Sequence, residues 1–478
     1  CRKKLNQLKL TLILLFFFAF AVRVIASFLS PVPLWDETVY SNLGFDLSSN
    51  FLHYSFDGGW SDFVPGGMFP HAGFRAPLLP AIMSFFFLFD LEFLINLFIP
   101  LVGALSVVLL YYFAKDLFNE GVAKYSSTIF AILPLHSVYS GKILTGVLCT
   151  FFLILTFLSF WRGFELGIKK YKLFFGFFLS LAFLTRYTTL WIMPIFLLYF
   201  LIRYRSLNFF KDNYLWYAIL VFFVTLIPYF LYSFFDYGNI FGAVLHGAEA
   251  AKYWGGVQPW YFFFLHWFEM FSIIGIVFLF SLIYIFYKKL YIKKEIYLLL
   301  IWIFFLLIIA IFVPHKETRF ILPIVPPLVL ISGFFINKLK NKKLIISIVF
   351  IILLISTAFS FGIIYNTYHN INTQCFMGVV SELEEKENIL IVSENPPIYY
   401  YFVKNENRYY PDELNVYSIK NIVKNTDKQV YFVFTKFNSG FEYAKFEFLK
   451  EILSENYNEI YSCELDSNVN FIYVSNIE

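Results

Sequence analysis

The chain has 478 residues, of which 59% are hydrophobic and only 15% are charged, and its mean hydropathy is +0.67. This balance argues against a soluble globular protein and indicates a membrane protein that crosses the bilayer several times. The net charge of +4 is small and scattered, so no surface for nucleic acid is indicated. The four cysteines show neither a CxxC motif nor the spacing of metal ligands.

The first apolar run covers residues 10–29 and is long enough to cross a bilayer as a helix, which needs about 20 residues. It resembles a retained span rather than a cleaved signal peptide. Basic residues are concentrated between positions 2 and 9, just before this run. Because cytoplasmic segments collect Lys and Arg, we expect a cytoplasmic N-terminus and an external first loop over residues 30–92.

Five later loops are distinctly basic and are therefore expected on the cytoplasmic side, with poorly basic segments between them outside. They lie around Lys115 and Lys124, and at 162–172, 203–211, 288–294 and 338–343.

This alternation predicts about eleven spans. They lie near residues 10–29, 93–113, 123–139, 143–161, 171–186, 188–203, 214–235, 267–287, 295–313, 320–337 and 344–364.

The segment 76–90 is apolar but too short for a span. If it crossed the membrane, every later basic loop would face outside. We therefore expect it to be a helix in the outer interface. The membrane domain then covers residues 1–365.

Residues 366–478 change character and are expected to form a small extracytoplasmic α/β domain. Short β-rich runs at 389–393, 430–434 and 470–475 alternate with helical patterns. Cys375 and Cys463 both fall in this domain, where free thiols are favoured over a disulfide between them.

Cations are scarce on the predicted outer face. Arg23 lies inside the first span, where a charge costs about 2.5–3.5 kcal/mol unless it finds a partner. A structural interpretation stays open for each of these cations, namely pairing with a carboxylate or with carbonyls at a helix end. In the outer loops the basic residues are Arg75, Lys142, Arg186, Lys252, Lys316 and Arg319.

Two adjacent carboxylates, Asp36 and Glu37, open the first external loop. Carboxylates and cations on one outer face suit transfer of a sugar from a polyprenyl-phosphate carrier. Cations would neutralise the donor phosphate and the departing phosphate, and a carboxylate would take the proton of the acceptor hydroxyl. Phe-rich helices would offer the polyprenyl tail an apolar groove.

The order of Arg23, WDETVY (35–40) and FRAPLLP (74–80) resembles the GT-C superfamily of membrane glycosyltransferases. It is most similar to the family-39-like branch of dolichyl-phosphate-mannose protein mannosyltransferases and aminoarabinose transferases. LTRYTTLWIMP (184–194) resembles an outer turn of that family, and HKETRFILPIVP (315–326) resembles an element of related lipid-linked mannosyltransferases. The resemblance covers roughly residues 10–335 and implies the GT-C fold.

The resemblance implies that Asp36 is the catalytic base and that Glu37 orients the acceptor or supports the base. His71 would shape the loop near the acceptor. A purely structural Asp36 and a salt-bridged lid built from residues 315–320 are the alternatives. The residues implied in binding donor phosphate or substrate are Arg75, Lys142, Arg186, Tyr187, His315, Lys316, Glu317 and Arg319.

The function expected is therefore an inverting hexosyltransferase, with mannose favoured, that acts on a protein, glycolipid or glycan acceptor. Some GT-C enzymes use a divalent metal, but the first loop lacks a DxD motif, so neither a metal nor another cofactor is expected. A transporter or flippase of lipid-linked sugars is the alternative, although it would place polar residues near the midplane of several spans. A non-enzymatic scaffold would leave both motifs unexplained.

Overall fold

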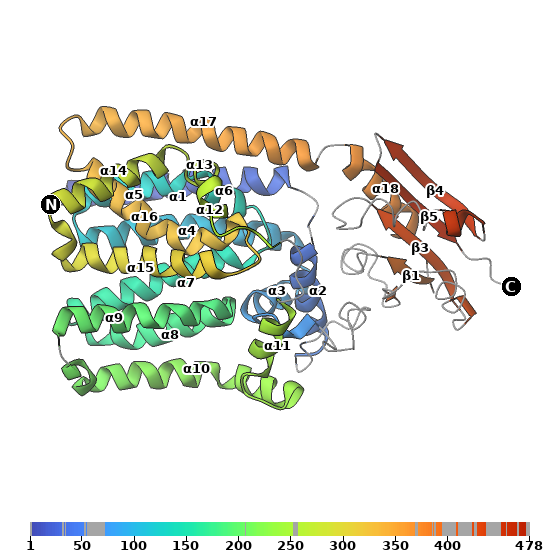
Figure 1. Cartoon of the computed structure of the whole chain (residues 1–478), viewed down its shortest axis with the longest axis horizontal. Helices are drawn as coiled ribbons and strands as arrows, with labels where there is room; N and C mark the ends of the chain where they lie inside the picture. The colour runs from blue at the N-terminus through green and yellow to red at the C-terminus, as the bar shows by residue number, and fades with distance from the viewer. Residues whose placement is uncertain are drawn as a thin grey trace.

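The computed structural model describes residues 2–30, 33, 35–51, 54, 72–205, 207–251, 257–368, 371–384, 386, 389–393, 408–409, 423–424, 428–435, 451–455, 457–465 and 468–474. Within these ranges, long helices run side by side in one bundle, and a small β-sheet lies beyond one end of it (Figure 1). The N-terminus lies at the opposite end of the bundle from this sheet (Figure 1).

Eight helical segments in the described ranges are long and apolar enough to cross a membrane. Each of them falls on a span that the hydropathy pattern predicts, which confirms a helical membrane domain. The helices that form them are α1 (Arg2–Leu29), α4 (Ile95–Leu117), α7 (Thr145–Phe160), α9 (Met193–Tyr204), α10 (Asn213–Tyr237), α15 (Lys294–Phe312), α16 (Val325–Ile336) and α17 (Lys342–Tyr368).

The remaining predicted spans are helical but shorter or interrupted. The span expected at 171–186 is α8 (Lys169–Thr185), which has 17 residues. The span expected at 267–287 is divided into α13 (Trp267–Phe271) and α14 (Ile273–Tyr287). Length and composition alone therefore give eight spans, although helix occurs at all of the predicted positions.

The span expected at 123–139 is broken into α5 (Glu120–Ala131) and α6 (Pro134–Tyr139). Pro134 begins α6, and because proline lacks a backbone N–H it cannot continue the hydrogen bonding of α5. The last carbonyls of α5 consequently need partners from outside the helix.

Arg23 supplies these partners. Its side chain is fully buried, and its guanidinium donates to the carbonyl oxygens of Ala131 at 2.8 Å and Phe130 at 3.2 Å. It also lies 2.9 Å from Nδ1 of His136 in α6. The charge inside the first span therefore has the structural role that was left open above, because it caps a helix break within the bundle.

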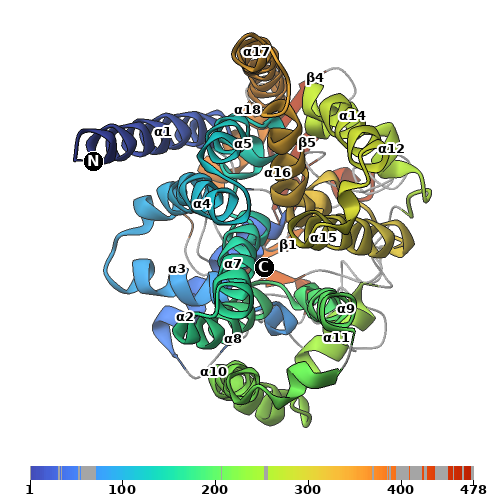
Figure 2. The ribbon, with the colours of Figure 1, turned by 90° about the vertical axis from the view of Figure 1, so that its left-hand side faces the viewer.

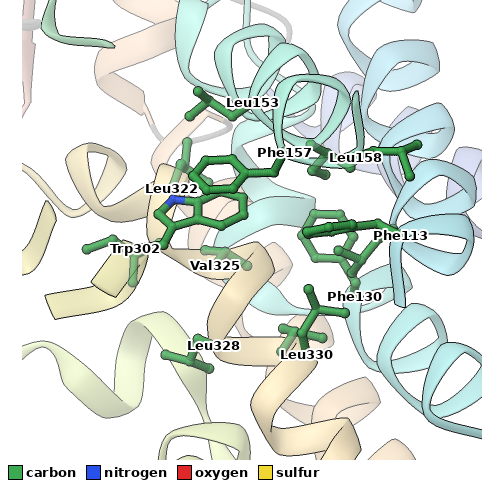
Figure 3. Close-up of a cluster of buried hydrophobic side chains, with 14 of the residues drawn as sticks. Phe113, Phe130, Leu153, Phe157, Leu158, Trp302, Leu322, Val325, Leu328 and Leu330 are labelled. Atoms are coloured by element: carbon green, nitrogen blue, oxygen red, sulfur yellow. The ribbon is translucent and has the colours of Figure 1, made fainter. Parts of the chain in front are cut away.

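Figure 2 looks along the bundle and shows α7 and α16 near its centre, with α10, α14 and α17 at its periphery. Burial agrees with this arrangement. In the most apolar stretches of the spans that contain α7 and α16, 78% of the residues are buried, whereas in that of α17 only 17% are buried. The central packing is aromatic and aliphatic (Figure 3). In it, the rings of Phe157 from α7 and Trp302 from α15 stack with their centroids 3.5 Å apart.

Short helices gather at the end of the bundle near the sheet (Figure 1). They are α2 (Trp35–Ser49), α3 (Leu78–Leu88) and α11 (Gly242–Ala250). α3 coincides with the segment expected in the interface. α2 and α3 pack closely because Gly44 has no side chain; a Cβ there would lie 2.9 Å from Cβ of Met83. The described α-helices of the loop 30–92, α2 and α3, thus lie at one end of the membrane domain.

The described strands form one mixed sheet in the order β2-β1-β3-β5-β4. The predicted strands are β1 (Ile389–Ser393), β3 (Gln429–Thr435) and β5 (Asn468–Val474), and β1 and β3 are parallel. The hydropathy pattern missed β2 (Arg408–Tyr409) and β4 (Asn458–Leu465), which form the two edges. Edge strands bury less apolar surface, so their sequences show weaker periodicity.

The sheet packs on α18 (Ile371–Glu384), and their shared core includes Val379 and Ile391. Leu29 of α1 and Val138 of α6 pack against this core, so the sheet contacts the end of the bundle where α2 lies. The side chains of Cys375 and Cys463 lie outside the described residues, and their pairing stays a prediction.

Candidate active site

Asp36 stands in the first turn of α2 and is bound by two arginines from distant segments. Its Oδ1 lies 3.2 Å from a guanidinium nitrogen of Arg75, and its Oδ2 accepts a hydrogen bond of 2.7 Å from Arg319. The Asp36 side chain is still 26% exposed. The first loop and the segment before α16 therefore meet at one carboxylate that solvent or a substrate can reach.

The segment between α15 and α16 extends this ion-pair cluster. Arg319 also donates to Oε1 of Glu317 at 2.6 Å, and Nε2 of His315 lies 3.1 Å from the same oxygen. Arg319 is the second residue of the 3₁₀-helix η8 (Thr318–Ile324), in which Pro323 interrupts regular α-helical hydrogen bonding. The cluster therefore runs from His315 through Glu317 and Arg319 to Asp36.

Arg186 approaches the same cluster from the turn after α8. Its guanidinium lies 4.8 Å from the ring centroid of Phe320, and that of Arg319 lies 5.8 Å from the same ring. Arg186 also acts electrostatically on Asp36. Within the described residues, the Arg186 guanidinium has neither a carboxylate nor a hydrogen-bond acceptor as partner. Arg186 is therefore a half-buried cation whose donors are available to an incoming anion.

The electrostatics of Asp36 follow from these neighbours. Burial alone would raise the pKa of its carboxyl, but the charges of Arg75 and Arg319 outweigh burial and hold the pKa below its usual range. The position at the N-terminal turn of α2 also favours a negative charge. Asp36 is therefore ionised, and with both arginines in place it is a weak base.

Glu37 faces a different part of the structure. Its Oε1 accepts a hydrogen bond of 2.8 Å from the backbone N–H of Ile143, and its side chain is buried. Burial lowers the pKa of nearby Lys142, and the Glu37 charge opposes that shift. Glu37 and Lys142 thus tie α2 to the turn between α6 and α7, rather than joining the ion pairs of Asp36.

Tyrosine hydroxyls position Arg75. Tyr54 and Tyr187 both donate to the carbonyl oxygen of Arg75, at 3.2 Å and 3.1 Å. The Arg75 guanidinium lies 5.7 Å from the ring centroid of Tyr40, one helical turn after Asp36. The sequence analysis missed Tyr40 and Tyr54. The four-residue spacing between Asp36 and Tyr40 could have indicated the first, but no local pattern indicates the second.

Lys316 points away from the cluster. It is buried, and its Nζ donates to the carbonyl oxygen of Gln258 at 2.9 Å. The neighbouring His315 pairs with Val257 in an isolated antiparallel bridge. Lys316 thus fixes the segment around 257 against the segment that carries Arg319. His71 and Lys252 lie outside the described residues.

A second contact missed by the sequence analysis joins α6 to η8. The hydroxyls of Tyr139 and Thr318 lie 2.9 Å apart. Tyr139 ends α6, the second half of the broken span, so this half contacts the segment that carries Arg319.

The described residues contain no group of three or more His, Cys, Asp or Glu side chains placed to hold a metal ion. The carboxylates of Asp36 and Glu317 are bridged by Arg319. Guanidinium groups in these positions repel a divalent cation and attract phosphate.

The model of a protein family described as Alg9-like mannosyltransferases matches residues 15–405 of the chain. No curated protein sequence matches it. The match extends over most of the membrane domain and includes both segments that form the ion-pair cluster.

Solved structures share the fold at low sequence identity. ArnT from Cupriavidus metallidurans bound to undecaprenyl phosphate has a TM-score of 0.74 and 12% identity, with 97% of each chain covered. The Archaeoglobus fulgidus oligosaccharyltransferase, in complex with Zn and sulfate, has a TM-score of 0.61 and 14% identity, covering 96% of this chain and 72% of the other.

The archaeal oligosaccharyltransferase AglB from Archaeoglobus fulgidus, in complex with an inhibitory peptide and a dolichol-phosphate, has a TM-score of 0.56 and 12% identity. That alignment covers 95% of this chain and 74% of the other. These similarities confirm the expected GT-C fold.

Proposed function

The chain belongs to the Alg9-like mannosyltransferase family, and on this basis we propose that it transfers a mannose-like hexose from a polyprenyl- or dolichyl-phosphate carrier to an acceptor outside the cytoplasm. The observation that carries the proposal is the pair of contacts between Asp36 and its arginines, beside Arg186, which has no ion-pair partner among the described residues. ArnT was solved with undecaprenyl phosphate and AglB with a dolichol-phosphate, which supports a lipid-phosphate donor.

The proposed orientation follows from charge. The basic loops expected in the cytoplasm lie at helix ends on the same side as the N-terminus, and α2, which carries Asp36, lies at the other end (Figure 1). The site and the C-terminal sheet then face the extracytoplasmic side. The acceptor would approach from there, whether it is a protein, a glycolipid or a glycan.

Donor binding is assigned to Arg186 and Arg319. Arginine binds phosphate through paired N–H groups, and the N–H groups of Arg186 have no acceptor among the residues that the structure describes. Arg319 is shared between two carboxylates, so a phosphate group that reaches it competes with Asp36 and Glu317. His315 and Glu317 would contact the sugar or hold Arg319 in place. The cationic site requires no metal or other cofactor in this proposal.

Competition between phosphate and Asp36 for Arg319 changes the pKa of Asp36. When phosphate draws Arg319 away, Asp36 loses the closer of its two ion pairs and its pKa rises. Asp36 then becomes a better general base at the moment when the donor is in place. The carboxylate is thus held inactive by the same arginine that recognises the donor.

The reaction proposed is a single displacement with inversion. The acceptor oxygen forms a bond to the anomeric carbon, the bond between that carbon and the phosphate oxygen breaks, and Asp36 takes the hydroxyl proton. Arg186 and Arg319 stabilise the charge left on polyprenyl phosphate. Glu37, which holds the turn at Ile143, orients α2 and thereby Asp36.

The test uses the purified chain in liposomes with a mannosyl polyprenyl phosphate that carries separate labels on sugar and lipid. Sugar on an acceptor together with an equal amount of free polyprenyl phosphate supports the proposal. Movement of the intact donor between leaflets, without cleavage, would instead support the flippase alternative.

A further inference from the structure

A second cationic site lies at the opposite end of the bundle from α2, where α9 ends and α15 begins (Figure 1). A cavity of about 590 Å³ opens between these helices, and the residues that line it include Arg203, Arg205 and Lys294. None of these residues contributes to the transfer reaction proposed above. Three cations around one cavity form an arrangement that requires an explanation of its own.

A single carboxylate organises two of the cations. Glu165 is almost fully buried, and its Oε2 accepts a hydrogen bond of 2.6 Å from Lys294. Its Oε1 lies 3.2 Å from Nε of Arg203 and accepts a further bond of 2.8 Å from Tyr199. Arg203 uses Nε for this contact, and within the described residues its two terminal nitrogens have no hydrogen-bond acceptor. One negative charge thus fixes two positive ones.

Arg205 adds the third charge without a partner. It ends α9 in a left-handed backbone conformation, with φ of 50° and ψ of 24°, which is costly for a residue other than glycine. Within the described residues its guanidinium has no ion-pair or hydrogen-bond partner, yet it lines the cavity. The cavity therefore carries a net positive charge, even after Glu165 is counted.

The rim of the cavity is apolar. Ile202 and Ile292 are 50% and 69% exposed, and Tyr291 is 40% exposed. Exposed apolar side chains at the ends of spanning helices lie at the level where lipid headgroups meet acyl chains. A ligand with a phosphate group and an apolar tail satisfies both the cavity and its rim.

We propose that this cavity binds the phosphate headgroup of an anionic phospholipid from the leaflet on the N-terminal side of the bundle. Arg205 and the free donors of Arg203 contact the phosphate, Lys294 adds charge, and the exposed isoleucines face the acyl chains. Basic pockets between membrane helices on the cytoplasmic side bind such headgroups by the same chemistry. The site is independent of the proposed transfer reaction.

The test measures lipid binding to the purified full-length chain by native mass spectrometry, with phosphatidylglycerol and phosphatidylcholine as probes. Arg205→Gln removes a charge that has no protein partner, and its affinity for phosphatidylglycerol should fall about fivefold. Glu165→Gln removes the opposing charge, and its affinity should rise. Lys289→Gln is the matched control, because Lys289 is exposed, has φ of 52° and does not line the cavity.

The two variants are expected to change lipid affinity in opposite directions, so the proposal stays falsifiable even if one of them folds poorly. Preference for phosphatidylglycerol that falls in Arg205→Gln, rises in Glu165→Gln and persists in Lys289→Gln supports the lipid site. Efficient displacement of the lipid by inorganic phosphate supports a phosphate site filled by a soluble anion instead of a headgroup. Equal affinities in the natural chain, Arg205→Gln and Glu165→Gln would overturn the proposal.

Discussion

Arg319 donates a hydrogen bond of 2.7 Å to Asp36, although 283 positions separate the two residues in the sequence. The contact joins the start of the first loop to the segment before α16. It neutralises the proposed base in the absence of donor and makes donor binding a condition for activating it. The ion pair is therefore the relationship from which the predicted behaviour of variants follows.

Arg186→Gln separates donor recognition from folding. Because Arg186 has no carboxylate partner among the described residues, its removal leaves no described acidic group unpaired. A hydrogen bond to a charged group contributes about 1.5–3 kcal/mol, so the donor KM should rise roughly tenfold or more while thermal stability is kept. Steady-state kinetics and thermal unfolding in detergent measure the two effects. An unchanged donor KM would remove Arg186 from the donor site.

The stability of Glu37 variants is expected to depend on whether the new side chain keeps a hydrogen-bond acceptor, more than on whether it keeps the charge. Glu37→Gln retains an oxygen that can accept the N–H of Ile143, whereas Glu37→Ala leaves that buried donor without its acceptor. The alanine variant should lose about 1–3 kcal/mol of unfolding free energy, and the glutamine variant much less. Chemical or thermal unfolding compares them. Equal losses in both variants would show that the charge of Glu37, beside Lys142, decides its role.

The pH dependence should differ between the free enzyme and the donor complex. The Asp36 pKa is held below its ordinary value of 3.8, so the acid limb of kcat/KM for the donor should lie below that pH. With donor bound, Arg319 is engaged by phosphate, the pKa rises, and the acid limb of kcat should lie at higher pH.

The same shift has a consequence for stability. Because the folded-state pKa of Asp36 is depressed, its ion pairs stabilise the fold above the ordinary carboxyl pKa and are lost as pH falls through the folded-state value.

The kinetic prediction would be contradicted if the acid limbs of kcat and of kcat/KM lay at one common pH, because Arg319 would then not exchange between Asp36 and the donor.

Much of this architecture could be predicted because hydropathy and loop charge are local properties. The eight long spans and the short helix α3 follow from apolar length alone. The approach of Arg319 to Asp36 followed from the parity of the spans, which places both residues on one face. The roles of these site residues stay predictions.

Other features depend on tertiary contacts that no local pattern contains. At the break before Pro134, Arg23 and Thr357, both distant in sequence, donate to the carbonyls of Ala131 and Ile132. Glu37 turns toward Ile143 because adjacent residues on a helix point in different directions. The hydroxyl of Tyr54 donates to the carbonyl of Arg75, although 21 positions separate the two residues.

The most direct measurement is the rate of sugar transfer by Asp36→Asn, with Asp90→Asn as the matched control. Asparagine keeps the shape of Asp36 and removes the base, and Asp90 is exposed with φ of 55°, a conformation that asparagine tolerates. We predict that Asp36→Asn lowers kcat by about two to four orders of magnitude while donor still binds, and that Asp90→Asn transfers sugar at the natural rate. Near-normal turnover by Asp36→Asn would contradict the assignment of Asp36 as the base.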